Sequence, residues 1–470
     1  MGKHALSTTE GVPDVLRKDL SSSQMEEKTG NSASVWSFIT NHAHTFCRSN
    51  SSSNIHCGFR KNMRVRWNAA WRRAIIIDPV RCLQERVSGC HKALSSSTSK
   101  QPIWLLGVCY NCSSSEGHAS NNEIYKQFET DIHSRIWVTY RRGFQVIMGT
   151  NITTDVGWGC MIRSAQMLLA QALICHRFGR SWRRSDVNNT THSSMRGYLE
   201  ILQCFGDTPN CPISIHNMVK SGGPYGLVPG SWMGPFAICR TLESLLVTYG
   251  RSCLISNNKP AFPIAVHVVA GEAECGRGGA PCICIEAILE TCNDFKDIFE
   301  EGCGLMLLVP LVLGINKLNQ RYLSSLFETF TFPQSLGILG GKPGASTYLV
   351  GVQGDQVLYM DPHHTQQTCI ISPDNPKADT STYHCSNLKR MPLRTIDPSL
   401  ALGFYCRDEE DFKDLCGRAV ALERKGNGAP IFTVVQSKDE LSIKDSHKVT
   451  CPQNESIKDI NEAEEGWQIL

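Results

Sequence analysis

The sequence predicts an α+β fold with an antiparallel sheet and with flexible tails at both ends. Apolar residues recur at helical spacing over 127–135 and 161–178. Shorter apolar runs over 305–313, 347–353 and 356–361 have the length of buried strands and are bounded by turn residues. Separate helical and strand patterns within one chain are typical of α+β proteins, in which helices cover an antiparallel sheet.

The helix expected over 161–178 is the best defined element, because no Gly or Pro interrupts its apolar spacing. Gly179 follows this run as a helix stop. The helix begins directly after a Gly-Trp-Gly turn, which places Cys160 at its N-terminus. The positive end of the helix dipole and the unpaired N–H groups there stabilise a thiolate, the reactive form of cysteine.

A buried structural cysteine is the competing interpretation of Cys160, because unpaired cysteines are among the most buried residues of proteins. The chain contains 22 cysteines, so a position at the start of a helix does not by itself identify a reactive one. The hypothesis of a thiol nucleophile therefore requires a base elsewhere in the sequence.

The expected hairpin, with its Gly-Asp turn at 354–355, supplies a candidate base. Asp361 and His363 follow its second strand at a spacing of two residues, which places both side chains on one face of extended backbone. Pro362 points the other way and restricts φ, which stiffens the pair. His363 is then the preferred base, with Asp361 fixing its tautomer, and His364 is the weaker candidate because it faces away. A solvated Asp-Pro-His-His turn is the competing interpretation.

Composition divides the chain into three parts. Residues 1–100 form a Ser-rich, partly disordered extension, residues 101–418 contain the expected elements, and residues 419–470 form a polar, flexible tail. The extension includes a basic, Trp-containing stretch over 60–86. This stretch is either an amphipathic helix that contacts a membrane surface or a helix that packs on the central domain, and we favour the second interpretation.

The charge and hydropathy of the sequence exclude several classes of protein. The net charge of +3 is too small to favour binding of nucleic acid. The N-terminus lacks the apolar core of a secretion signal, and Leu6 breaks the myristoylation pattern. The apolar run over 305–313 contains Pro310 and is too short for a transmembrane segment. We therefore expect a cytoplasmic protein.

The cysteines do not form a pattern typical of a metal site. Cys109 and Cys112 form a C-x-x-C pair without a partner pair, and Cys282 and Cys284 are too close for a normal zinc pair. The cytosol keeps such thiols reduced. We therefore expect no metal and no other cofactor.

With these motifs the chain resembles the autophagin family, the papain-like cysteine proteases of autophagy. The matching segments occur in the family's order across 101–418. They include TDVGWGCMIR, LGGKP and YMDPHHTQ, which begin at residues 154, 339 and 359, together with RIWVTYR and GFYCRDEEDF, which begin at residues 135 and 403. The segments IWLLGVCY from residue 103 and PGSWMGP from residue 229 resemble the plant branch. The resemblance implies a papain-like fold for this central domain.

The resemblance also implies a role for each matching residue. Cys160 corresponds to the nucleophile, His363 to the base and Asp361 to the residue that orients the base. Tyr140 corresponds to a tyrosine that helps to stabilise the oxyanion, because its O–H can donate to developing charge beside the Cys160 N–H. Trp232 corresponds to a residue that covers the active-site entrance. It is accompanied by a mobile loop that consists of Lys342, Pro343, Gly344 and Ala345.

The implied activity is cleavage of the C-terminal extension of a ubiquitin-like autophagy modifier, which exposes the modifier's terminal glycine. The same chemistry would release the modifier from its phosphatidylethanolamine conjugate, because only the leaving amine differs. The alternatives are a non-catalytic scaffold that binds the modifier and an unrelated papain-like amidase or transferase. The intact Cys160, Asp361 and His363 argue against the scaffold.

The tail ends in acidic residues followed by Trp467 and Leu470. An aromatic residue, with an aliphatic residue three positions later and acids before it, resembles the short motif that binds autophagy modifiers. Such a peptide can add a strand to the edge of a sheet while its two side chains fill pockets. W-x-x-L patterns also occur by chance, and the position in an acidic tail favours the modifier-binding motif.

Overall fold

The computed structural model describes residues 101–111, 118–184, 192–256, 263–269, 280–296, 303–375, 379–385, 388–426 and 428–440. All of them belong to one compact unit of the chain. The extension over 1–100, with its basic stretch, and the Trp467 and Leu470 motif lie outside the described residues. Within the described ranges, no helix combines the length and the apolar character needed to cross a membrane.

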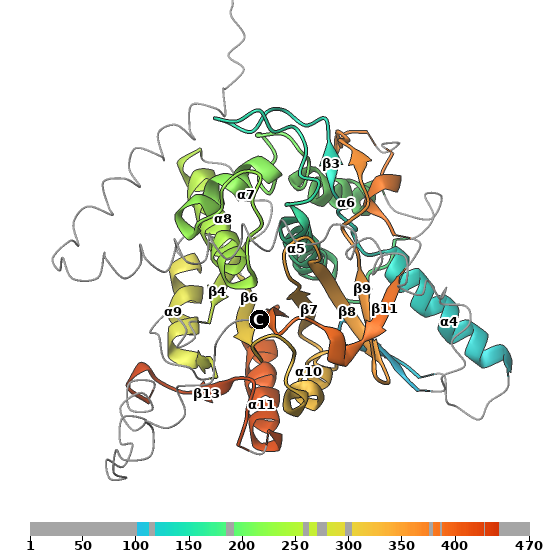
Figure 1. The fold of residues 1–470 in the computed structure, drawn as a ribbon, viewed down its shortest axis with the longest axis vertical. Coiled ribbons are helices and arrows are strands. Elements are labelled where there is room, and N and C mark those ends of the chain that lie inside the picture. Colours follow the sequence, from blue (N-terminus) through green and yellow to red (C-terminus); the bar gives the residue numbers. More distant parts are fainter. Residues whose placement is uncertain are drawn as a thin grey trace, which may run out of the picture. The chain divides into compact units, whose positions relative to one another are not determined.

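A central sheet carries the loops that form the candidate site (Figure 1). Its strands follow the spatial order β11-β9-β8-β7-β12-β6-β4, and the hairpin β1-β2 adds to β8 beside β7. Neighbouring strands are antiparallel except for β4 and β6. The strands are β1 (Ile103–Leu105), β2 (Val108–Tyr110), β4 (Ile264–Val268), β6 (Gly304–Val312), β7 (Ser335–Gly340), β8 (Thr347–Gln353), β9 (Gln356–Met360), β11 (Lys389–Pro392) and β12 (Ser399–Cys406).

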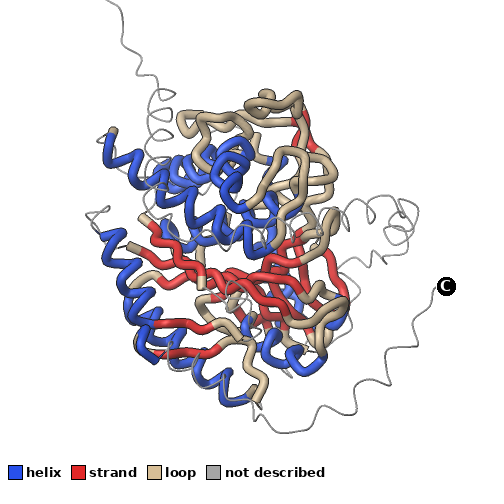
Figure 2. Tube along the Cα trace, turned by 60° about the vertical axis from the view of Figure 1, so that its left-hand side comes forward, coloured by secondary structure: helices blue, strands red, loops and turns tan. Residues whose placement is uncertain are grey.

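Helices cover both faces of this sheet, as Figure 2 shows. The α-helices are α4 (His118–His133), α5 (Cys160–Phe178), α6 (His192–Cys204), α7 (Ile215–Gly222), α8 (Pro235–Ile255), α9 (Ile285–Lys296), α10 (Leu323–Thr329) and α11 (Glu409–Lys425). Short 3-10 helices are η2 (Gly223–Tyr225), η4 (Gln320–Tyr322), η5 (Ser381–Tyr383) and η6 (Leu393–Thr395).

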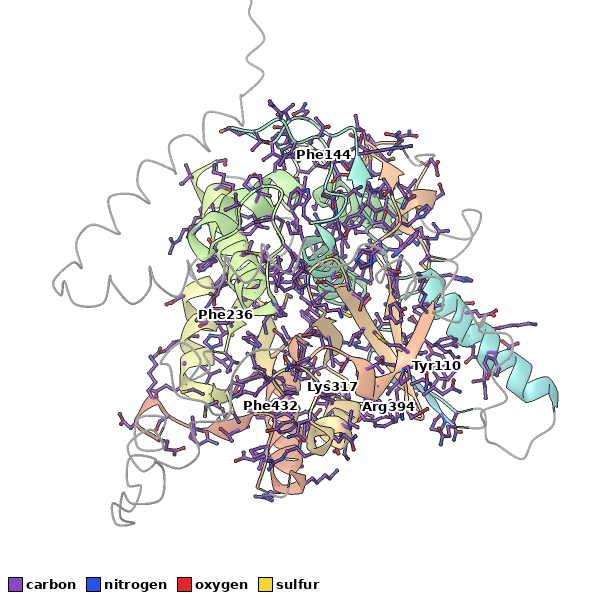
Figure 3. The ribbon with its side chains drawn as sticks, in the orientation of Figure 1. Tyr110, Phe144, Phe236, Lys317, Arg394 and Phe432 are labelled. Atoms are coloured by element: carbon purple, nitrogen blue, oxygen red, sulfur yellow. The ribbon has the colours of Figure 1, made fainter. Side chains whose placement is uncertain are left out.

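Strand β6 shows why a continuous apolar run is needed at the centre of the sheet. Successive side chains of a strand point to opposite faces, so both faces of a covered strand must be apolar. Leu305, Leu307 and Val309 belong to the core shared with α9, α10 and α11, whereas Met306 and Leu308 belong to the core shared with α5, α6 and α8. Phe144 packs in the core that contains α5, and Phe432 packs in the core that contains α11. Figure 3 shows Phe144 in the upper part of the view and Phe432 in the lower part.

The predicted α+β fold is confirmed, and the predicted elements coincide with observed ones. The helix expected over 161–178 is α5, and Gly179 ends it with a positive φ of 82°. The strands expected over 305–313, 347–353 and 356–361 are β6, β8 and β9. The helix expected over 127–135 is α4, which runs from His118 to His133. Its first turns are polar and carry no apolar period, so the apolar spacing did not predict the earlier start.

Two short parallel pairs join segments that are far apart in the sequence. Strand β3 (Arg141–Arg142) pairs with β10 (Gln366–Gln367), and β5 (Cys282–Cys284) pairs with β13 (Thr433–Val435). The first pair places the segment after Tyr140 beside the segment after His363. Residues from both halves of the domain therefore meet at one place.

Strand β8 passes β1 at a distance that only glycine permits. A Cβ atom on Gly351 would lie 2.2 Å from the carbonyl oxygen of Trp104. This obstacle is backbone, so it cannot rotate away as a side chain could. The close approach matters for the site because β8 leads through a tight hairpin into β9, which ends just before Asp361.

Replacing Gly351 by Ala should therefore destabilise the domain by about 1–3 kcal/mol, the usual cost of overpacking. The measurement is the urea midpoint of unfolding. Gly417→Ala is the matched control, because an added Cβ there meets nothing within 4 Å in the middle of α11. That variant should gain about 0.5–1 kcal/mol, since Ala loses less backbone entropy in a helix. Equal midpoints for the two variants would contradict the packing argument.

Candidate active site

Cys160 is the first residue of α5 and is fully buried. The chain reaches it through a tight turn, in which the backbone oxygen of Asp155 accepts hydrogen bonds from the N–H groups of Trp158 at 3.2 Å and Gly159 at 2.8 Å. Gly157 has a positive φ of 87°. A Cβ atom on Gly159 would lie 2.3 Å from Asp155 Oδ2, so the turn requires glycine there. The thiol therefore lies at the N-terminal end of the helix, as the sequence predicts.

A buried group of charged residues lies beneath this turn. Asp155 Oδ1 accepts a hydrogen bond from the Arg141 backbone N–H at 2.7 Å, and Arg163 Nε donates to Asp155 Oδ2 at 2.8 Å. Arg163 Nη1 donates to Asp207 Oδ1 at 2.8 Å. Burial acts to lower the pKa of Arg163, but the two carboxylates outweigh burial and raise it. The guanidinium of Arg141 lies 3.9 Å from Asp207 Oδ2, so two carboxylates and two guanidinium groups balance in charge, which makes their burial tolerable.

Asp361 and His363 come together directly after β9. Asp361 Oδ1 accepts a hydrogen bond from the His363 backbone N–H at 3.0 Å and also contacts the ring Nδ1. The other ring nitrogen, Nε2, is buried and has no hydrogen-bond partner among the described residues, which leaves it available to Cys160. The structure thus produces the same-face arrangement that the spacing of two residues predicts.

His364 is directed elsewhere. Its ring stacks on the indole of Trp137, with the ring centroids 5.9 Å apart and the planes 19° from parallel. The same indole donates a hydrogen bond from Nε1 to the backbone oxygen of Asp361 at 2.9 Å. Trp137 therefore fixes the backbone that carries the Asp361 and His363 pair and separates His364 from it.

Lys389 is a further partner of the carboxylate that sequence analysis missed. Its Nζ donates to Asp361 Oδ2 at 2.6 Å, so each carboxylate oxygen has its own partner. Burial acts to raise the pKa of Asp361, but His363 and Lys389 outweigh burial and lower it well below its usual range. Strand β11 places Lys389 there by pairing it with Tyr359 of β9. No sequence spacing reveals this contact, because it depends on the order of strands in the sheet.

His363 and Cys160 shift each other's pKa toward an ion pair. Burial acts to lower the pKa of His363, but the contacts with Asp361 and Cys160 outweigh burial and raise it to about 9. Burial acts to raise the pKa of Cys160, but His363 and Ser346 outweigh burial and lower it below that of an ordinary thiol. Both shifts favour the ion pair of thiolate and imidazolium, the state in which a cysteine acts as a nucleophile.

Tyr140 completes the surroundings of the thiol. Tyr140 is buried, and its ring meets the His363 ring edge to face. The ring centroids are 5.4 Å apart and the ring planes are 84° apart. Its hydroxyl is buried and has no hydrogen-bond partner among the described residues. Burial and then Cys160 raise the pKa of Tyr140, so the phenol stays protonated. An O–H donor without a partner beside the thiol is suited to bind developing negative charge.

Trp232 and the loop over 342–345 meet at Ser346. The Trp232 indole Nε1 donates to Ser346 Oγ at 2.8 Å, and Ser346 directly follows the loop. The loop is closed by a hydrogen bond from the Ala345 N–H to the Lys342 carbonyl at 2.9 Å. Ser346 is fully buried, and its backbone and hydroxyl are among the groups that lower the pKa of Cys160. Sequence analysis identified the loop and the tryptophan but missed the serine that joins them.

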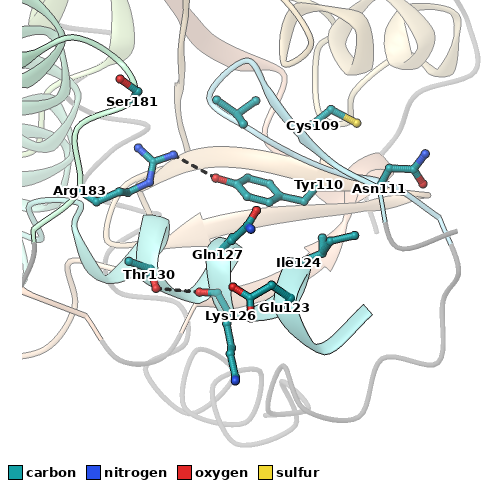
Figure 4. A pocket seen from close by; sticks show the side chains of 11 residues that line it. Cys109, Tyr110, Asn111, Glu123, Ile124, Lys126, Gln127, Thr130, Ser181 and Arg183 are labelled. Atoms are coloured by element: carbon teal, nitrogen blue, oxygen red, sulfur yellow. Dashed lines mark hydrogen bonds between the residues drawn. The ribbon is translucent and has the colours of Figure 1, made fainter. Parts of the chain in front are cut away.

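The other predicted sites do not lie here. Trp467 and Leu470 fall outside the described residues, and within the described ranges no three His, Cys, Asp or Glu residues are grouped so as to bind a metal ion. A pocket of about 620 Å³ lies between β2 and α4 rather than at the thiol. Tyr110 lines it and accepts a hydrogen bond from Arg183 at 3.1 Å (Figure 4). None of the candidate catalytic residues lines this pocket.

Residues 125–418 match the family described as the peptidase C54 catalytic domain. The cysteine protease ATG4B of Oryza sativa subsp. indica is 47% identical over 395 residues, which cover 82% of this chain and 81% of the rice protein. The cysteine protease ATG4b of Arabidopsis thaliana is 48% identical over 396 residues, or 83% and 81% of the two chains. The cysteine protease ATG4B of Xenopus laevis is 35% identical over 353 residues, or 73% and 85%. The chain is more similar to these plant proteins than to the frog protein.

Replacing Asp361 by Asn should raise the pH at which Cys160 becomes reactive. The charge of Asp361 raises the pKa of His363, and the resulting imidazolium stabilises the thiolate. Without that charge the pKa of Cys160 rises, so the midpoint of the pH profile for alkylation of Cys160 by iodoacetamide should move up by about one unit or more. His364→Ala is the control and should leave the midpoint in place. An unchanged midpoint in Asp361→Asn would show that this carboxylate does not sustain the ion pair.

Proposed function

The chain belongs to the peptidase C54 family and is a cysteine peptidase, and we propose that it processes a ubiquitin-like autophagy modifier. In this proposal it removes the C-terminal extension of the modifier, exposes the terminal glycine, and also releases the modifier from phosphatidylethanolamine. The observation that supports the proposal most strongly is the buried Cys160 at the start of α5, with its pKa lowered by His363, together with the contact between His363 and Asp361. The names of the plant and frog relatives point to the same class of protease.

The proposed first step forms a thioester. The Cys160 thiolate attacks the carbonyl carbon of the modifier's last glycine, and the oxyanion that forms accepts hydrogen bonds from the Tyr140 hydroxyl and the Cys160 backbone N–H. His363 then donates its Nε2 proton to the leaving amine as the C–N bond breaks. Asp361 orients the imidazolium and stabilises its charge throughout.

The proposed second step hydrolyses the thioester. His363, now neutral, removes a proton from water, and the water oxygen attacks the thioester carbonyl. The C–S bond breaks, the modifier leaves with a free carboxylate, and Cys160 and His363 return to the thiolate and imidazolium pair. The peptide extension and the lipid headgroup are both joined to the glycine through an amide. One acylation chemistry therefore serves both reactions, and only the leaving amine changes.

We propose that Trp232 and the loop over 342–345 form a gate over the thiol. Cys160 is fully buried in this structure, so a substrate carbonyl reaches it only if something moves. The contact between Trp232 and Ser346 joins the two parts of the gate. Gly344 has a positive φ of 74°, a backbone freedom that favours loop motion. A narrow opening of this kind would select a thin, glycine-ended tail.

The alternatives have less support. A non-catalytic scaffold has no need of a cysteine with a lowered pKa beside an oriented imidazole. An unrelated papain-like amidase or transferase is disfavoured by the match of residues 125–418 to a peptidase domain. We place the proposed reactions in the cytoplasm, where the modifier and the cytoplasmic face of membranes are both accessible.

We also propose that Trp467 and Leu470 bind a second surface of the modifier. The support is the sequence alone, in which acidic residues precede the two apolar side chains. Acidic residues would speed encounter with a basic surface, and a second contact would raise the effective concentration of the modifier at the cleft.

The proposed reaction is tested by turnover of a modifier that carries a C-terminal extension. The wild-type chain should cleave it after the glycine, and Cys160→Ser should cleave none, because a serine at this position lacks the thiolate. The variant should still bind the modifier in calorimetry, since the side-chain volume hardly changes. Cleavage by Cys160→Ser at the wild-type rate would refute the assignment of the nucleophile, and failure of the wild type to cleave would refute the function.

The tail is tested by the double variant Trp467→Ala with Leu470→Ala. It should bind the full-length modifier about tenfold or more weakly, within the range expected for loss of a tethered second contact. Its cleavage of a short peptide reporter should equal that of the wild type, because a peptide offers no second surface. Equal affinity of the variant and the wild type for the full-length modifier would eliminate the motif.

A further inference from the structure

Lys389 shares the carboxylate of Asp361 with the imidazole of His363. Its Nζ donates to Asp361 Oδ2 at 2.6 Å, while Oδ1 contacts the ring Nδ1 and accepts the His363 backbone N–H at 3.0 Å. The side chain of Asp361 is 20% exposed and that of Lys389 is 36% exposed. Most of the carboxylate is therefore shielded from water, in contrast to an ordinary surface ion pair, which solvent screens strongly.

The register of the sheet brings these two side chains together. Lys389 of β11 lies opposite Tyr359 of β9, so both side chains point to the same face. Asp361 follows Tyr359 by two residues, which makes it the diagonal neighbour of Lys389, within reach of a long side chain. Arg390 is the next residue of β11 and points to the opposite face, so it cannot take the place of Lys389.

A shared carboxylate holds the proton of an imidazolium less tightly than an unshared one. The negative charge of Asp361 favours the protonated form of His363, and the positive charge of Lys389 at the other oxygen offsets part of that effect. The carboxylate does not depend on Lys389 to stay in place, because the His363 backbone N–H holds Oδ1. Lys389 therefore changes the charge that the imidazole meets more than the position of the carboxylate.

We propose that Lys389, by sharing the Asp361 carboxylate, lets His363 release its proton at neutral pH in the proposed reaction. In the first step this proton passes from His363 Nε2 to the nitrogen of the leaving amine as the C–N bond breaks. In the second step His363 must be neutral to take a proton from water as the water oxygen attacks the thioester. Lys389 keeps its own proton throughout and acts through Asp361. This inference rests on the proposed function and adds to it a residue that controls when the base is available.

The surroundings of His363 explain why such a residue is needed. Burial acts to lower the pKa of His363, but Asp361 and Cys160 outweigh burial and raise it to about 9. An imidazole that stays protonated at neutral pH is a poor acceptor for a proton from water. Formation of the thioester removes the charge of Cys160 and leaves that of Asp361. Lys389 therefore acts on the charge that remains when the base is needed.

Two phenols also face the Asp361 and His363 pair, and neither carries charge at neutral pH. Tyr140, from the segment before β3, meets the His363 ring edge to face. Tyr359 of β9 lies close enough to Asp361 for the carboxylate to act on its pKa. Burial raises the pKa of both phenols, to about 12 for Tyr359, so both stay protonated.

Two further titratable groups near the pair do not replace Lys389. His364 is exposed and stacks on Trp137, so solvent screens any charge that it carries. The carboxylate of Asp155 lies behind the turn, where Arg163 binds both of its oxygens. The positive charge of Lys389 is the one that the structure places directly on the carboxylate of the pair.

The test follows the titration of the His363 imidazole by NMR in the full chain, with carbon-labelled histidine rings. The chain contains 15 histidines, and the resonance of His363 is identified by its absence from His363→Ala. Cys160→Ser is the background for every variant, because it removes the coupled thiol and matches the uncharged sulfur of the thioester. The measurement needs no substrate.

Lys389→Met keeps the length of the side chain and removes its charge. It should raise the midpoint of the His363 titration by about half a unit or more, because Asp361 then acts on the imidazolium without an opposing charge. Lys389→Arg keeps the charge and should keep the midpoint within about 0.3 unit of the parent value. An unchanged midpoint in Lys389→Met would overturn the proposal. A lower midpoint would also overturn it, because it would mean that Lys389 holds Asp361 against the imidazole.

Lys425→Met is the matched control for the loss of an ion pair. Lys425 Nζ donates to Glu328 Oε1 at 2.6 Å, the same distance as in the Lys389 pair, but this pair joins α11 to α10. The variant should leave the midpoint of the His363 titration in place. A rise in this variant equal to that in Lys389→Met would show that the shift does not come from the carboxylate of Asp361.

A second measurement follows the thioester with the modifier in single-turnover samples of the chain with Cys160 intact, quenched in acid and weighed by mass spectrometry. Lys389→Met should hydrolyse the thioester about threefold more slowly at pH 7, since half a unit of pKa lowers the neutral fraction of His363 by about that factor. The two rates should converge at high pH, where His363 is neutral in both chains. Equal rates at pH 7, or a deficit that persists at high pH, would overturn the proposal.

The inference and the proposed function fail separately. A wild-type chain that does not cleave the extended modifier would refute the proposed function, while the NMR midpoints would still show whether Lys389 opposes Asp361. A chain that cleaves the modifier, but whose midpoint does not depend on Lys389, would leave the function intact and refute the role of this lysine.

Discussion

The carboxylate of Asp155 is the constraint on which the rest of the site depends. One oxygen accepts the backbone N–H of Arg141, the residue after Tyr140, and the other accepts Arg163 of the first turn of α5. Its backbone oxygen also shapes the turn that leads into Cys160. A single buried residue therefore sets the position of Tyr140, the proposed oxyanion donor, relative to Cys160, the proposed nucleophile. Its charge is tolerable only because Arg163 neutralises it, so the pair acts as one structural unit.

Local spacing is sufficient to predict the parts of this site that lie within one element. The helix over 161–178 follows from an apolar period without Gly or Pro, so its first residue, Cys160, could be placed at a helix end. The Asp361 and His363 pair follows from the alternation of side chains along extended backbone. Both predictions depend on geometry that the chain carries over a few residues, and tertiary packing did not have to supply it.

Contacts between distant segments could not be predicted in this way. Lys389 reaches Asp361 because β11 pairs with β9, and Asp207 reaches Arg163 from a separate loop. Ser346 stands at the end of a recognised loop, but only packing shows that it accepts a hydrogen bond from Trp232. Strand order and loop packing are properties of the whole domain, and no period within one sequence encodes them.

The pairing of β3 with β10 has a consequence for the synthesis of the chain. This pair joins the segment that follows Tyr140 to the segment that follows His363. The proposed nucleophile and its proposed base therefore belong to two halves of the domain that leave the ribosome at different times. By the proposed mechanism, a nascent chain that ends before β9 holds the cysteine without its base, so it cannot cleave its neighbours. Two separately expressed halves would regain chemistry only when they reassemble, which makes this domain suited to a split reporter of association.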